Sequence, residues 1–313
     1  MICTTFRRSL NLLQKYTKFF AASRMKIFSF LNHSRRFPEW SYTSTGRIWR
    51  LLFSDSGRII GESRNPDLKQ ASFFCVDERT GENLWENLTM QEPWWVGMES
   101  VQKDVLILHE FAKPDLPEHK GIKAYDVESG RVLWHSQEMT YWFGYQNSVY
   151  AYKTLFERRI GYSLDLRSGE VAKEYGDTFE GLEQVRSLAQ SEDRLEDYRF
   201  PQVFDPHTAD PRSVAAIQRV AKRDRIMGEV EFVREKEYLL FNYHVPEKTS
   251  RPEAISLENH LEIVEVEKNE KVFSELLTRG AKAPVPDSFF VKGDFVYYIK
   301  DEHTLSALRL WKS

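Results

Sequence analysis

Cysteine is scarce in this chain, since its 313 residues contain only Cys3 and Cys75. Two thiols cannot build a disulfide framework or a four-ligand zinc site, and the eight histidines lack metal-ligand spacing. Cys75 lies in the apolar run 73–76, so we expect a buried strand thiol; a nucleophile needs an electropositive, accessible setting. The composition fits a reducing compartment, and we expect a cytoplasmic protein.

Neither sign of charge dominates, because 44 Lys and Arg stand against 47 Asp and Glu. This mixture argues against a chain that binds nucleic acid through bulk positive charge, and 41% hydrophobic residues argue against a disordered polyelectrolyte. No apolar run reaches the ~20 residues that a membrane-spanning helix needs. We therefore expect a globular, monomeric protein.

The first 38 residues differ from the rest, because they carry eight basic residues and no acidic one. The remaining 275 residues have a net charge of −11. Apolar residues such as Leu12, Tyr16 and Phe19 recur at helical spacing over residues 9–21. Two interpretations are open: residues 1–36 form a disordered leader, or their amphipathic stretch makes weak contact with an anionic membrane surface.

A short pattern, Asp-x-x-Thr/Ser-Gly, occurs three times in the first half of the chain. Its aspartates are Asp77, Asp126 and Asp165. They lie 49 and 39 residues apart, which brackets the ~40–50-residue period of propeller blades. An Asp carboxylate can accept hydrogen bonds from the backbone of the turn that it opens, and Gly allows the positive φ at the end of that turn. Because the group recurs in every repeat, we assign it to hairpin turns and not to catalysis.

Each turn follows two further strand candidates, which gives four strands per repeat. Two weaker copies follow at residues 229–277 and 288–311, and the last copy is one strand short. Residues 37–43, at the start of the domain, can supply the missing strand and so remove the exposed edges.

Residues 177–225 do not fit a blade, because their apolar spacing predicts helices, one of them starting at Asp210-Pro211. Without them, the chain has room for five blades of ordinary length. We therefore predict an all-β fold over residues 37–313. It is a five-bladed β-propeller whose N-terminal strand closes the last blade, with a helical insertion between blades three and four.

The extended pattern Asp-x-x-Thr/Ser-Gly-x-x-Leu-Trp resembles the blades of quinoprotein-like β-propellers with PQQ-type repeats. The layout also resembles an uncharacterised bacterial family known as a domain of unknown function. The resemblance covers residues 39–175 well and residues 226–313 weakly. It implies a fold and no chemistry, since propellers include scaffolds, lectins and enzymes. Quinone-dependent dehydrogenases with such repeats use more blades than this chain can build, so we expect no cofactor and no metal.

Alignment of the repeats places eight residues at the mouth of the expected axial channel. They are Trp49, Arg50, Trp94, Trp95, Tyr141, Trp142, Glu229 and Asp287. Aromatic rings with a few polar groups suit a planar or sugar-like ligand. Packing of the tryptophans between neighbouring blades is the alternative interpretation.

The sequence has no hydrolase or nucleotide-binding motif. We therefore expect a non-catalytic binding or scaffold protein that recognises a protein or small ligand at the channel mouth or at the insertion. The alternative is a propeller enzyme of the glycoside hydrolase type. Its carboxylates would be Glu229 and Asp287, followed by Asp55 and Glu99.

Overall fold

The computed structural model describes residues 36–113, 116–156, 158–192, 195–248 and 256–311. Apart from Arg36, the leader expected at residues 1–36 lies outside the described residues, as does its amphipathic stretch 9–21. Among the helices of the described residues, none has the length and apolar character needed to cross a membrane.

The described residues form five antiparallel sheets, in agreement with the predicted all-β fold. The first contains β2 (Arg47–Phe53), β3 (Arg58–Asn65), β4 (Gln70–Asp77) and β5 (Asn83–Leu88). The second contains β6 (Val96–Gln102), β7 (Val105–Lys113), β8 (Leu116–Asp126) and β9 (Val132–Ser136). The third contains β10 (Thr140–Tyr145), β11 (Ser148–Leu155), β12 (Arg158–Asp165) and β13 (Val171–Gly176).

The last two sheets have five strands each, because the insertion adds a short strand to both. The fourth runs in the order β15 (Gln202–Val203), β16 (Met227–Glu235), β17 (Tyr238–Pro246), β18 (Leu257–Glu265) and β19 (Glu270–Ala281). The fifth runs in the order β1 (Trp40–Thr43), β22 (Thr304–Arg309), β21 (Phe295–Lys300), β20 (Phe289–Lys292) and β14 (Tyr198–Arg199). The predicted pairing of the two chain ends is confirmed, since Trp40 lies opposite Ala307 and Thr43 opposite Thr304.

The three repeated aspartates form turns, as predicted. An Oδ1 oxygen of Asp77 accepts the backbone N–H of Thr80 at 2.9 Å, and that of Asp165 accepts the N–H of Ser168 at 2.8 Å. The bonds from Ser168 lower the pKa of the Asp165 carboxyl. The Oδ1 oxygen of Asp126 likewise accepts the backbone N–H of Ser129, at 2.9 Å. The side chains are therefore occupied by their own turns.

Tryptophan side chains connect each of these turns to the neighbouring sheet. The indole Nε1–H groups of Trp40, Trp85 and Trp134 donate to the carbonyls of Glu78, Val127 and Leu166, at 3.1, 2.7 and 2.9 Å. Each acceptor directly follows the aspartate of a turn, and each indole also covers the glycine of that turn. The third repeat has Lys173 where the first two have tryptophan, so the third sheet has no indole at this position that could bond to a turn of a neighbouring sheet.

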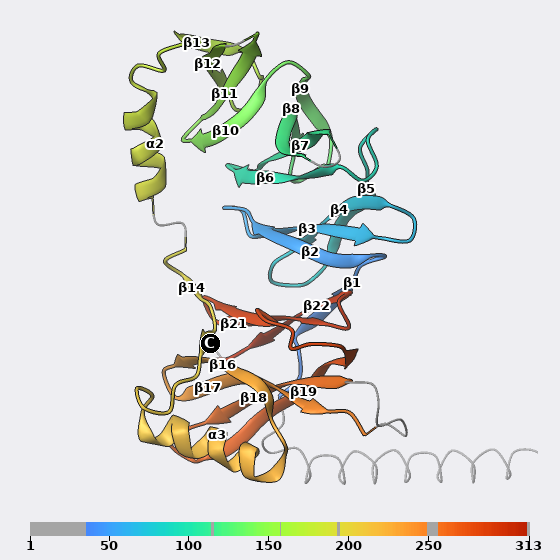
Figure 1. Cartoon of the computed structure of the whole chain (residues 1–313), viewed down its shortest axis with the longest axis vertical. Helices are drawn as coiled ribbons and strands as arrows, with labels where there is room; N and C mark the ends of the chain where they lie inside the picture. The colour runs from blue at the N-terminus through green and yellow to red at the C-terminus, as the bar shows by residue number, and fades with distance from the viewer. Residues whose placement is uncertain (1–35, 114–115, 157, 193–194, 249–255, 312–313) are drawn as a thin grey trace, which may run out of the picture.

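Figure 1 shows the five sheets following one another along the long axis in the order third, second, first, fifth and fourth. The third and fourth sheets, consecutive in sequence, lie at opposite ends of this row. The predicted ring of sheets is therefore open between the third and fourth sheets in the described residues. The chain between β13 and β16 runs back along one side of the row.

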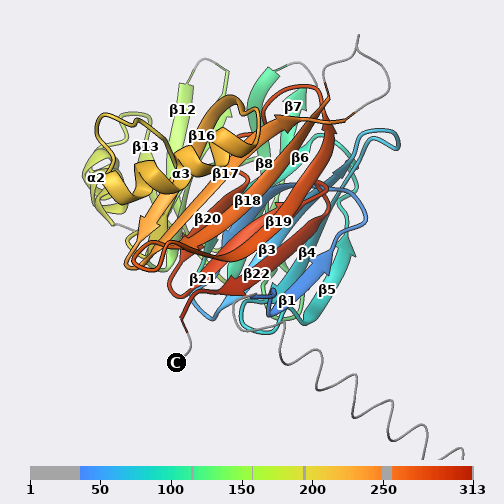
Figure 2. The ribbon, with the colours of Figure 1, turned by 90° about the horizontal axis from the view of Figure 1, so that it is seen from below.

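Residues 177–225, between the third and fourth sheets in sequence, contain two helices. They are α2 (Leu182–Ser191) and α3 (Pro211–Arg223), and Asp210 caps α3 as predicted. Ile217 and Val220 of α3 pack against the fourth sheet, over β16–β18 (Figure 2). At the other end of the row, Leu182 of α2 is buried close to Gly161 of the third sheet. α3 thus covers an apolar face of the fourth sheet, whereas α2 contributes one buried residue beside the third sheet.

The segment after α2 forms two short strands, β14 and β15. Tyr198 and Arg199 of β14 pair with Lys292 and Val291 of β20, and β15 pairs with β16. The insertion is thus fixed to the fourth and fifth sheets. Cys75 is fully buried in β4, as expected, and burial raises the pKa of its thiol to about 12.

Candidate functional site

A cavity of about 420 Å³ lies where β2, β6 and the segment 195–200 meet. We call it the β2 pocket. Its apolar wall includes Trp49, Tyr198, Phe200 and Phe290. Its polar lining includes Arg50, Glu99 and Ser100. Two of the eight predicted site residues, Trp49 and Arg50, therefore line one cavity.

Irregular pairing of the first strands positions these side chains. The β2–β3 register shifts between Ile48 and Arg50, which leaves Trp49 outside the ladder. The corresponding shifts leave Glu99 outside the β6–β7 ladder and Trp142 outside the β10–β11 ladder. In β16 the shift spans residues 228–230. Bulges of this kind aim side chains away from the regular pleat and are frequent beside binding sites.

The back wall of the β2 pocket comes from the insertion and the fifth sheet. Tyr198 lies 5.7 Å from Phe53 and 6.1 Å from Phe290, measured between ring centroids. Phe200 lies 6.0 Å from Phe290 in the same way. This wall was not predicted, because Tyr198 and Phe200 lie 92 and 90 positions from Phe290 and only the β14–β20 pairing brings them together.

Trp94 is connected to Trp49 through an arginine. The guanidinium of Arg64 lies 5.9 Å from the ring of Trp49 and 5.1 Å from that of Trp94. Arg50 donates a hydrogen bond to the carbonyl of Met98. Trp49 is 72% exposed, so packing between sheets does not account for its position.

None of the other predicted residues lines this cavity, although Tyr141 contacts a residue that does. Trp95 contacts Phe111, and the hydroxyl of Tyr141 donates to Ser100 Oγ at 3.0 Å. Trp142 packs against Phe179 of the connection to α2. Glu229 and Asp287 are exposed on the fourth sheet and before the fifth. The structure does not gather all eight at one mouth, and a ligand-binding role for these residues remains a prediction.

A further carboxylate, Glu231, lies between Glu229 and Asp287 and was missed in the sequence. Its Oε2 atom accepts the backbone N–H of Asp287 at 3.2 Å. Partial burial, and then the negative charges of Asp287 and Glu229, raise the pKa of Glu231. Only the fold reveals this neighbour, because Glu231 and Asp287 are 56 residues apart.

Glu99 also belongs to a second group, with His109 of β7 and His119 of β8. The Nδ1 atoms of His119 and His109 lie 2.6 and 3.1 Å from Glu99 Oε1. The two imidazole rings are stacked, with centroids 3.7 Å apart. Although burial opposes it, contact with the histidines lowers the pKa of the Glu99 carboxyl. The three ligand atoms lie within 4.8 Å of one another, close enough to bind one metal ion.

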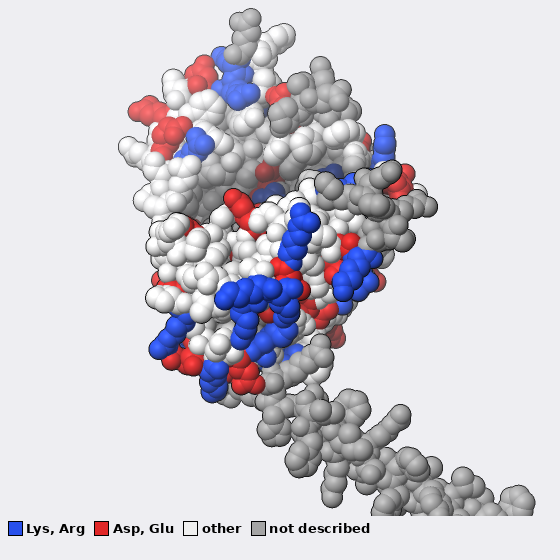
Figure 3. Space-filling model, turned by 60° about the horizontal axis from the view of Figure 1, so that its bottom comes forward, with Lys and Arg blue, Asp and Glu red and all other residues white. Residues whose placement is uncertain are grey.

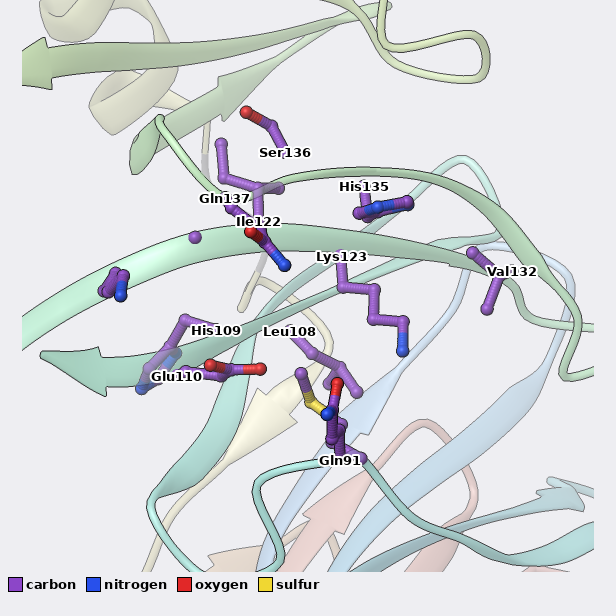
Figure 4. Close-up of a pocket in the computed structure, with 13 residues that line it drawn as sticks. Gln91, Leu108, His109, Glu110, Ile122, Lys123, Val132, His135, Ser136 and Gln137 are labelled. Carbon is purple, nitrogen blue, oxygen red and sulfur yellow. The ribbon is translucent and has the colours of Figure 1, made fainter.

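Sequence reasoning missed these histidines because ten residues separate them, unlike the short spacings of familiar metal motifs. The signal was present in the β7–β8 hairpin, whose register places Phe111 opposite His119 and so puts both histidines near each other. His109 also lines a cavity of about 460 Å³ over β7, β8 and β9. Figure 4 shows His109 and Val132 on opposite sides of that cavity.

The face of the fourth sheet and α3 carries both signs of charge. Figure 3 shows Lys and Arg interspersed with Asp and Glu there. A cavity of about 860 Å³ on this sheet contains Arg223, Lys271 and the buried Glu262. Glu262 Oε1 lies 3.0 Å from Arg223 and 3.5 Å from Lys271. Because these cations already have a carboxylate partner, the cavity is not an evident anion site.

Comparisons with known proteins concern part of the chain or its fold. Residues 53–134, about a quarter of the chain, match a family described as "Domain of unknown function (DUF4905)". No curated protein matches the chain.

Three solved structures are similar over most of the chain. BamB from Moraxella catarrhalis is 10% identical, with 83% of this chain and 81% of that chain covered and a TM-score of 0.27. The Dos1 propeller is 11% identical, with 85% and 68% covered and a TM-score of 0.29. The β-propeller domain of the Trilobed protease from Pyrococcus furiosus is 10% identical, with 83% and 65% covered and a TM-score of 0.29. Similarity this weak carries no information about function.

Proposed function

We propose that this protein is a non-catalytic binding protein that holds a small ligand in the β2 pocket. The observation that carries the proposal is the 72% exposure of Trp49, which a bulge places beside Arg50 in a cavity of about 420 Å³. An exposed tryptophan offers a large flat surface for stacking. The ligand has a flat apolar face, aromatic or sugar-like, and an acceptor group that meets Arg50.

The size and lining of the β2 pocket support this class of ligand. Pockets for small molecules occupy roughly 300–1,000 Å³ and combine apolar walls with a few placed polar groups. The guanidinium of Arg64 lies near both Trp49 and Trp94, and cation–π attraction favours these ring positions. The bond from Arg50 to the Met98 carbonyl orients its guanidinium beside the apolar wall.

We also propose the architecture that positions the β2 pocket. The five sheets are the blades of a propeller with PQQ-type turns, open between the third and fourth blades, and residues 177–225 form the insertion that covers the two ends. A cytoplasmic location and a monomeric state, expected from the composition, belong to the same proposal.

Binding of 8-anilinonaphthalene-1-sulfonate, a flat aromatic anion, tests the pocket. We expect Trp49→Ala and Arg50→Ala each to weaken its binding by about fivefold or more, since one loses the stacking surface and the other the cation. Fluorescence titration of the folded full chain measures the dissociation constant. Phe156→Ala is the matched control, because Phe156 is a fully exposed aromatic that does not line the β2 pocket.

Maltohexaose serves as a second probe in the same titration, followed through tryptophan fluorescence. Binding of maltohexaose that depends on Trp49 identifies a sugar ligand, and binding of the anion alone identifies an aromatic acid. If Trp49→Ala and Phe156→Ala bind both probes as the wild type does, the β2 pocket is not the binding site.

A glycoside hydrolase is the second candidate function, and Glu231 is the observation that favours it. Glycoside hydrolysis uses two carboxyl groups, one as the acid and one as the base or nucleophile. A carboxyl with a raised pKa, such as that of Glu231, suits the acid, and a neighbouring carboxylate suits the second role. In this alternative, Glu231 is the acid, and Asp287 or Glu229 is the second carboxylate. This replaces the pair Glu229 and Asp287 expected from the sequence.

Glu231→Gln is expected to stabilise the protein at neutral pH and not at acidic pH. The pKa of Glu231 is higher in the folded chain than in the unfolded chain, so the folded chain binds more protons between the two values. Wild-type stability therefore falls as the pH rises through this window, and the glutamine variant lacks that loss. We expect a gain of about 0.5–1 kcal/mol at pH 7, measured by urea unfolding across pH.

Asp287→Asn gives a check on the cause, because it removes a neighbouring negative charge. We expect it to reproduce part of the gain at pH 7. The same variants test the enzyme alternative, since loss of the acid must abolish any hydrolysis of 4-nitrophenyl glycosides. Equal stability of Glu231→Gln and wild type at every pH contradicts the assigned interaction.

A further inference from the structure

Three strands of the second sheet bring one carboxylate and two imidazoles together. Glu99 comes from the bulge of β6, His109 from β7 and His119 from β8, and all three ligand atoms lie within 4.8 Å of one another. A second bulge, where the β7–β8 register shifts between Leu108 and Glu110, lies next to His109. Two irregularities in one sheet thus flank the same group of side chains.

His109 is the unusual member of this group. It is only 4% exposed, yet neither of its ring nitrogens has a hydrogen-bond partner among the described residues. Its Nδ1 atom lies 3.1 Å from Glu99 Oε1, but the contact lacks hydrogen-bond geometry. A buried polar group without a partner is costly, and a bound metal ion removes that cost for one nitrogen.

The stacking of the two rings points in the same direction. With centroids 3.7 Å apart and planes at 11°, the stacked rings of His109 and His119 both place their Nδ1 atoms near the Oε1 atom of Glu99. Neutral imidazoles and an ionised carboxylate are the forms that bind a metal ion. We propose that Glu99, His109 and His119 form a site for a divalent transition-metal ion.

The ligand set selects the class of metal. Two imidazole nitrogens and one carboxylate oxygen suit Zn²⁺, Fe²⁺ and related ions, whereas Ca²⁺ and Mg²⁺ prefer oxygen ligands alone. Two donors on one tetrahedral zinc ion lie about 3.4 Å apart, and the His–Glu pairs at 2.6 and 3.1 Å are already near that separation.

Three protein ligands leave at least one coordination position for solvent or a substrate. The side chain of His119 is 34% exposed, so water reaches the site from that side. The site does not depend on a ligand in the β2 pocket, although Glu99 also lines that pocket.

Titration of the chelator-treated full chain with Co²⁺ tests the proposal, because Co²⁺ replaces Zn²⁺ and absorbs visible light when bound. We expect one Co²⁺ per chain, displaced by Zn²⁺. His119→Ala and Glu99→Gln are each expected to weaken Co²⁺ binding by more than about tenfold, since even changes around metal ligands cost roughly that much. His135→Ala is the matched control, an exposed histidine in the cavity that His109 lines.

The melting temperature provides a second readout, because a metal that binds only the folded chain raises it. Zn²⁺ should raise the melting temperature of the wild type and of His135→Ala, and not that of His119→Ala. His119 is partly exposed, so its replacement leaves the fold intact. Wild-type protein that binds Co²⁺ no more tightly than His119→Ala does overturns the metal site. Because Trp49 is not a ligand, Trp49→Ala should keep its Co²⁺ binding whether or not the β2 pocket holds a ligand.

Discussion

Trp134→Ala is expected to lower the free energy of unfolding by about 3–5 kcal/mol, as large-to-small changes of buried aromatic residues do. Trp134 is 9% exposed and belongs to the apolar core between the second and third sheets. Its Nε1–H group donates to the Leu166 carbonyl at 2.9 Å, and its ring covers the turn at Gly169. Alanine removes the packing, the hydrogen bond and the cover together. Urea unfolding followed by circular dichroism measures the loss.

Trp49→Ala is the matched control for this substitution, because Trp49 is 72% exposed. Its cost should be within about 0.5 kcal/mol, as for surface changes generally. Substitution of two glycines tests the contact between Trp134 and the turn at Gly169 through the turn itself. Gly169 and Gly176 both have positive φ, but a Cβ on Gly169 would lie 2.5 Å from Trp134, whereas one on Gly176 would meet nothing within 4 Å. Equal losses for Gly169→Ala and Gly176→Ala would contradict the role of the indole.

The turns and strands of this fold were predictable from the sequence because they depend on local chemistry. Asp77 and Gly81 form one hairpin turn within five residues, so the pattern contains its own explanation. The four strands expected in each repeat are present in the first, second and third sheets. The last repeat was recognised as one strand short of four, and β1 supplies the missing strand.

The order of the sheets in space was not predictable in the same way. A ring of five blades requires the third and fourth sheets to meet, and the sequence gives no measure of the space that the insertion takes up there. A helix starting at Asp210-Pro211 was predicted, but not that its residues Ile217 and Val220 pack against the fourth sheet. For this reason, the positions of Tyr141 and Glu229 relative to each other were not predictable either.

The candidate sites were predictable only where one strand supplies the residues. Trp49 and Arg50 are neighbours in β2, and they line one cavity as a result. His109 and His119 lie on different strands, β7 and β8. They lie close to Glu99 of β6 because the β6–β7 and β7–β8 pairs each have a bulge there, and no periodic pattern in the sequence indicates a bulge. Glu231 was missed because its neighbour Asp287 lies 56 positions away, in the connection between the fourth and fifth sheets.

Arg64→Met is expected to destabilise the protein by about 3–5 kcal/mol, because it leaves a buried carboxylate without its partner. Glu62 is only 2% exposed, and its Oε1 atom lies 2.6 Å from Arg64 Nε. The same guanidinium donates to the carbonyls of Trp94 and Val96, at 3.0 and 2.5 Å. The pair therefore joins the first sheet to the second. The midpoint and slope of urea unfolding give the loss.

The double variant Glu62→Gln/Arg64→Met separates the charge from the lost packing. Once Glu62 is neutral, the missing arginine no longer leaves an unpaired charge, so we expect the double variant to be more stable than Arg64→Met alone. Arg47→Met is the matched control, since its ion pair with Glu302 is half exposed and should contribute less than about 1 kcal/mol. If the double variant is less stable than Arg64→Met, the buried charge is not the cause, and the lost bonds to the second sheet account for the whole effect.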